Sequence, residues 1–65
     1  MTSLTLSICK STLENTIADN LEILNQEDQE SETYKLASPA IRISTTFCQN
    51  ALKEIEAELD RRRDA

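Results

Sequence analysis

The chain has 65 residues and a formal net charge of −5, with no glycine, no histidine, no tryptophan, one phenylalanine and one tyrosine. A chain this short holds one domain, whose core supplies only about 3–5 kcal/mol. Without glycine it lacks the turn and phosphate-loop residues of all-β and dinucleotide-binding folds. The absence of glycine therefore leaves an all-α protein as the expectation. The acidic balance disfavours nucleic acids and anionic membranes as partners.

Residues 1–8 alternate polar and apolar side chains, from Thr2 to Ile8. A strand this short has nothing to pair with, so we interpret the segment as an extended arm or a frayed helix start. It lacks the basic region and apolar run of a signal peptide, and nowhere does the chain hold the 18 apolar residues that span a bilayer. We therefore expect a cytoplasmic protein with no membrane insertion.

A first helix is predicted over about residues 11–25. Ser11 and Glu14 match a capping box, and Ser3 or Ser7 offers an earlier start that would add Leu6 to the helix. Spacings of four, four and three residues place the main apolar side chains on one helical face, and these are Leu13, Ile17, Leu21 and Leu24.

An acidic linker is predicted over about residues 26–37. Residues 25–33 contain no apolar side chain but four acids, and such a run repels itself and stays solvated. Tyr34 and Leu36 then return the chain to an apolar surface. Tyr34 either anchors the linker or contacts a partner, and the sequence favours neither role.

A second helix is predicted over about residues 39–62. Ser38 is placed as its N-cap and Pro39 at its first turn, where a missing N–H is tolerated. Ile41, Cys48 and Ile55 recur every seven residues, and a wider stripe surrounds them. The run from Arg61 to Arg63 complements the negative end of the helix dipole.

Two helices and a short polar connector predict an antiparallel hairpin, completed by a partner or by homodimerisation. The predicted seam consists of Leu13, Ile17, Leu21, Leu24, Cys48, Leu52, Ile55 and Leu59. The second stripe is wider than one helix can cover, and surplus apolar surface marks a docking face. The residues expected at this interface are Ile43, Phe47, Ala51, Tyr34 and Leu36.

The sequence gives no sign of catalysis, of a metal site or of a cofactor. The hairpin layout places Cys9 opposite Lys53 rather than Cys48, so a disulfide is not expected. Without histidine, neither thiol has an activating base, and the acids lack calcium-loop spacing. We expect a protein that is not an enzyme.

The chain resembles the small two-helix co-chaperones of type III secretion needle subunits, the YscE/SsaE-like proteins. The resemblance lies in residues 1–5, the amphipathic first helix, the acidic connector, residues 32–36 and a second helix with Ala-Leu-Lys-Glu-Ile at 51–55. It implies a bacterial virulence-related hairpin that packs on a TPR-like helical chaperone. Together the two would keep a polymerisation-prone needle subunit soluble.

Two other function classes stay open. Two hairpins could bury both stripes as a homodimeric four-helix bundle, in the manner of small phage or plasmid regulators. The protein could instead be an acidic inhibitor that occupies the nucleic-acid-binding groove of another protein. Of the three, a protein-binding co-chaperone is the leading hypothesis, with a helical chaperone, a secreted needle subunit or a second copy as the partner.

Overall fold

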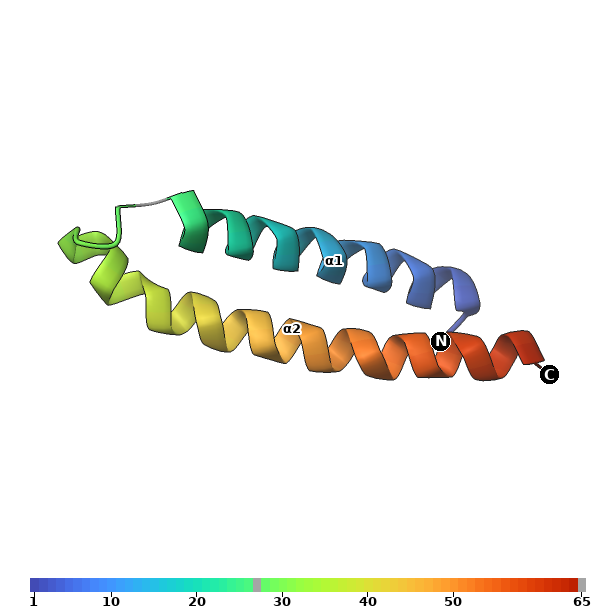
Figure 1. Cartoon of the computed structure of the whole chain (residues 1–65). Helices are drawn as coiled ribbons and strands as arrows, with labels where there is room; N and C mark the ends of the chain where they lie inside the picture. The colour runs from blue at the N-terminus through green and yellow to red at the C-terminus, as the bar shows by residue number, and fades with distance from the viewer. Residues whose placement is uncertain (27, 65) are drawn as a thin grey trace.

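The computed structural model describes residues 1–26 and 28–64. It shows two helices, α1 (Ser3–Gln26) and α2 (Glu32–Asp64), which pack against each other as an antiparallel hairpin (Figure 1). The predicted all-α hairpin is confirmed. The molecule measures 51 × 16 × 14 Å, and its N-terminus lies beside the C-terminal turns of α2.

Helix α1 begins earlier than the sequence predicted. Thr2 is its cap, because the Thr2 hydroxyl accepts a hydrogen bond from the Thr5 N–H at 3.1 Å and the Thr2 carbonyl accepts one from the Leu6 N–H. The predicted start at Ser11 is therefore wrong by eight residues, and the helix takes the earlier start left open for Ser3 or Ser7, with Thr2 as its cap. The early start matters for packing, since it makes Leu6 one of the most buried side chains of the chain, at 8% exposed.

The connection between the helices is shorter than the predicted linker. Asp28 organises its described part, because its carboxylate accepts from the Glu30 N–H at 3.0 Å and its carbonyl accepts from the Ser31 N–H. Ser31 then caps α2 by accepting from the Tyr34 N–H at 3.0 Å. Of the predicted linker, Gln26 and residues 32–37 are helical, and Glu27 lies outside the described residues.

Pro39 lies inside α2 and does not start it, so the predicted cap at Ser38 is wrong. A proline inside a helix removes one backbone hydrogen bond and costs about 3 kcal/mol. The Ser31 cap and the contacts of Tyr34 with α1 offset that cost. Pro39 is exposed, and the first turns of α2 bend toward α1 (Figure 1), as expected for a proline on the outer side of a kink.

The seam between the helices alternates steps of three and four residues, as in a coiled coil. On α2 it contains Tyr34, Ser38, Ile41, Thr45, Cys48, Leu52, Ile55 and Leu59, all buried or half-buried. On α1 it contains Leu6, Lys10, Leu13, Ile17, Asn20 and Leu24, also buried or half-buried. Leu21, predicted in the seam, is 43% exposed. The hairpin register turns Asn20 inward instead, and its amide donates to the Ser44 hydroxyl at 3.4 Å.

The hairpin leaves much of its surface uncovered. Its accessible surface is 4973 Å², whereas a compact monomer of this mass exposes about 4,200 Å². Its radius of gyration is 14.9 Å, against about 11 Å for a compact chain of this length. Among the described residues no large side chain is fully buried. One helix pair therefore buries only part of the apolar surface that the sequence provides.

Candidate protein-docking face

The middle of α2 turns its largest apolar side chains away from α1. Leu36, Ile43 and Phe47 are 84%, 71% and 73% exposed, and spacings of seven and four residues place them on one side of the helix. Ala40 and Asn50 lie on the same side and are also exposed. We call this surface, made of Leu36, Ala40, Ile43, Phe47 and Asn50, the outer face of α2.

On the inner side of the same segment, two small polar residues alternate with Ile41 and Cys48. Ser38 and Thr45 are buried against α1, at 7% and 6% exposed. The Thr45 hydroxyl finds its partner within the helix, donating to the Ile41 carbonyl at 2.8 Å. Over this stretch the outer side thus carries larger apolar side chains, Leu36, Ile43 and Phe47, than the inner side does. The better apolar face of α2 points outward.

Charge is nearly absent from this stretch. From Leu36 to Leu52, Arg42 is the one charged residue in the sequence, although acids and bases are frequent before and after it. A helix face that remains in water normally carries charged side chains. Arg42, Ile43, Thr46, Phe47 and Asn50 line a shallow open hollow on this face. A contiguous apolar surface that carries one charged residue, Arg42, is typical of a binding site.

Two of the predicted interface residues lie elsewhere. Tyr34 is half-buried, and its hydroxyl donates to the Leu24 carbonyl at 3.2 Å, so the ring reaches toward α1. Of its two possible roles, anchoring the turn is the one the structure displays. Ala51 is half-buried at the edge of the seam and does not extend the outer face. The other three predicted interface residues, Leu36, Ile43 and Phe47, lie on the outer face of α2.

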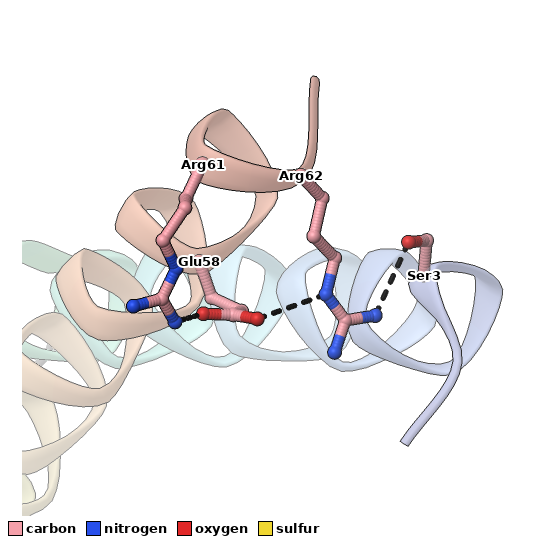
Figure 2. A network of polar contacts seen from close by, with 4 residues as sticks. All are labelled: Ser3, Glu58, Arg61 and Arg62. Carbon is pink, nitrogen blue, oxygen red and sulfur yellow. Dashed lines mark hydrogen bonds and ion pairs between the residues drawn. The ribbon is translucent and has the colours of Figure 1, made fainter. Parts of the chain in front are cut away.

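The open end of the hairpin carries a polar network (Figure 2). The Glu58 carboxylate pairs with both Arg61 and Arg62, with the Arg62 Nε at 2.9 Å. Arg62 also donates to the Ser3 hydroxyl at 3.2 Å and so connects the end of α2 to the start of α1. Ion pairs this exposed contribute only tenths of a kcal/mol, so the network positions the helix ends and adds little stability.

The thiols are separated by the hairpin register. Cys48 is buried, Cys9 is half-buried and both are free. The pairs Asn20–Ser44 and Ser3–Arg62 place Cys9 opposite Ile55, about 10 Å along α2 from Cys48. Within residues 1–26 and 28–64 there is no group of acids and cysteines that could hold a metal ion, and no helix long and apolar enough to cross a membrane.

Comparisons with known proteins identify no relative. No family model, no curated protein and no solved structure matches this chain.

Proposed function

We propose that this chain is a protein-binding module that works without catalysis, by docking the outer face of α2 onto an apolar, uncharged surface of another protein. The exposure of the largest apolar side chains of the middle of α2 is the observation that carries the proposal. Leu36, Ile43 and Phe47 face water while Ser38 and Thr45 face α1. Burying one such side chain contributes about 1.5–3 kcal/mol, so three in one row support a specific complex.

The groups that could carry chemistry support binding rather than catalysis. Cys48 is buried in the seam, where a thiol behaves as a small apolar side chain. Glu58 is held by two arginines at the open end. Both groups already have structural partners within the hairpin.

In its finer form, the proposal is a co-chaperone of a type III secretion needle subunit in the bacterial cytoplasm. The chain would act together with a TPR-like helical chaperone, and the outer face of α2 would contact that chaperone or the subunit. The sequence resemblance supports this form, together with a hairpin that has apolar surface to spare. A hairpin held by a larger helical protein would gain the covering that its own α1 does not provide.

Affinity capture with a matched pair of variants tests the proposal. Phe47→Gln removes the central apolar group of the outer face, and Leu4→Gln removes one on α1 that is equally exposed, at 72% against 73%. In the native bacterial cytoplasm, the wild-type chain and Leu4→Gln should retain the same protein and Phe47→Gln should lose it. Equal retention by both variants would exclude the outer face. Capture of a needle subunit or a TPR-like chaperone would support the finer form.

A further inference from the structure

We propose that, when no other protein is bound, a second copy of this chain covers the outer face of α2, so that two α2 helices pack antiparallel. The spacing of the exposed residues favours a helix as the occupant. Leu36, Ala40, Ile43, Phe47, Asn50 and Glu54 follow one another at steps of four and three residues, and all are exposed. This is a second coiled-coil seam, about 27 Å long, on the side away from α1.

The second seam is complementary to itself in the antiparallel direction. With Ile43 of one copy beside Phe47 of the other, residues whose numbers add up to 90 face each other. Ala40 then meets Asn50, and Leu36 meets the aliphatic stem of Glu54. A parallel pair would instead place Phe47 on Phe47 and Glu54 on Glu54, and like charges opposite each other are destabilising.

The charges beside the seam favour the same direction. At the ends, the acidic turn with Asp28, Glu30 and Glu32 comes beside Arg61–Arg63 of the second copy. Opposite charges at both ends set the direction and register of the pair.

The available area suits a weak dimer. Each copy presents three large apolar side chains that are 71–84% exposed. With the smaller residues between them, two copies would bury about 1,200 Å² in total, the lower limit for specific interfaces. We therefore expect dissociation in the micromolar range. The small residues Ala37, Ser44 and Ala51 between the outer face and α1 leave room for the approaching helix.

The first test is the mass of the purified chain measured by light scattering over a range of concentrations. The mass should rise from the monomer value of 7.3 kDa to about twice that value across the micromolar range. Phe47→Gln should remain monomeric and Leu4→Gln should behave as the wild type. A wild-type chain that stays monomeric at millimolar concentration would overturn the proposal. Because no other protein is present, this result is independent of the capture experiment above.

Cysteine crosslinking tests the geometry. In a Cys9→Ser, Cys48→Ala background, Thr46→Cys places a thiol next to the two-fold axis, whereas Lys53→Cys, on the same row, places two thiols about 24 Å apart along the helices. A bismaleimide crosslinker shorter than that should join Thr46→Cys chains and leave Lys53→Cys chains single. Equal crosslinking at both positions would exclude the antiparallel pairing. Circular dichroism of each variant checks that the hairpin is folded.

Discussion

The Tyr34 hydroxyl donates to the Leu24 carbonyl at 3.2 Å and joins the first turn of α2 to the last turn of α1. The last carbonyls of a helix have no partner within it and are commonly satisfied by a glycine-based cap or a nearby basic side chain. The chain contains no glycine, and the last turn of α1 has no basic residue. Tyr34 supplies the missing donor, and Arg42 reaches the same hydroxyl at 3.4 Å.

Removing this hydroxyl should loosen the turn. Tyr34→Phe keeps the ring but leaves the Leu24 carbonyl without its donor, at a cost of about 1 kcal/mol. In a domain of this size the melting temperature should fall by about 4–8 °C, measured by circular dichroism at 222 nm. An unchanged melting temperature would mean that water satisfies the carbonyl equally well.

The start of α2 can be tested with two serines. Ser31→Ala removes the oxygen that caps the Tyr34 N–H and should cost about 1 kcal/mol of unfolding free energy. Ser38→Ala changes a residue inside the helix, where alanine is the better helix former, and should cost less. Urea unfolding of both variants measures the difference. If Ser38→Ala were the more damaging change, a helix start at Pro39 would be the better description.

Leu6 and Leu4 test the early start of α1. Leu6 is 8% exposed and Leu4 is 72% exposed, two residues apart on the same helix. Leu6→Ala should cost about 2–3 kcal/mol, because it leaves a hole in the seam. Leu4→Ala should change the unfolding free energy by less than about 0.5 kcal/mol. Equal effects of the two substitutions would indicate that residues 3–8 do not pack on α2.

Phe47→Ala separates binding from folding. Because Phe47 is 73% exposed, the substitution should change hairpin stability by less than about 0.5 kcal/mol. It should weaken binding to the captured partner by a few kcal/mol, as buried aromatic anchors commonly do. Glu30→Ala, in the exposed turn, is the control and should do little. Calorimetric titration gives both affinities, and equal values for the two variants would contradict the docking face.

The general layout of the molecule was predictable because apolar spacing is a strong signal over long helices. The heptad of Ile41, Cys48 and Ile55 indicated the side of α2 that packs on α1. Ile43 and Phe47 lay outside that heptad, so they were predicted to face a partner. Helix boundaries were less predictable. Pro39 is typical of a helix start, and nothing local showed that the contacts of Tyr34 with α1 would extend the helix past it.

The rotation of each helix about its own axis, which decides the side chains that enter the seam, could not be predicted from the sequence either. Leu21 fits the face of Leu13 and Ile17 at steps of four residues, whereas a coiled-coil seam alternates three and four and selects Asn20. Ala51 follows Phe47 by four residues, but the same rotation brings it to the edge of α1. Such choices depend on the register between the helices, to which Asn20 and Ser44 contribute.

The outward direction of Leu36, Ile43 and Phe47 has a consequence for how much of this protein a cell would hold. A hairpin with a thin seam unfolds often, and proteases remove unfolded chains. Any protein that binds the outer face raises the ratio of folded to unfolded chains, and the ratio rises with the free concentration of that protein. The abundance of this chain should therefore rise with the abundance of its partner.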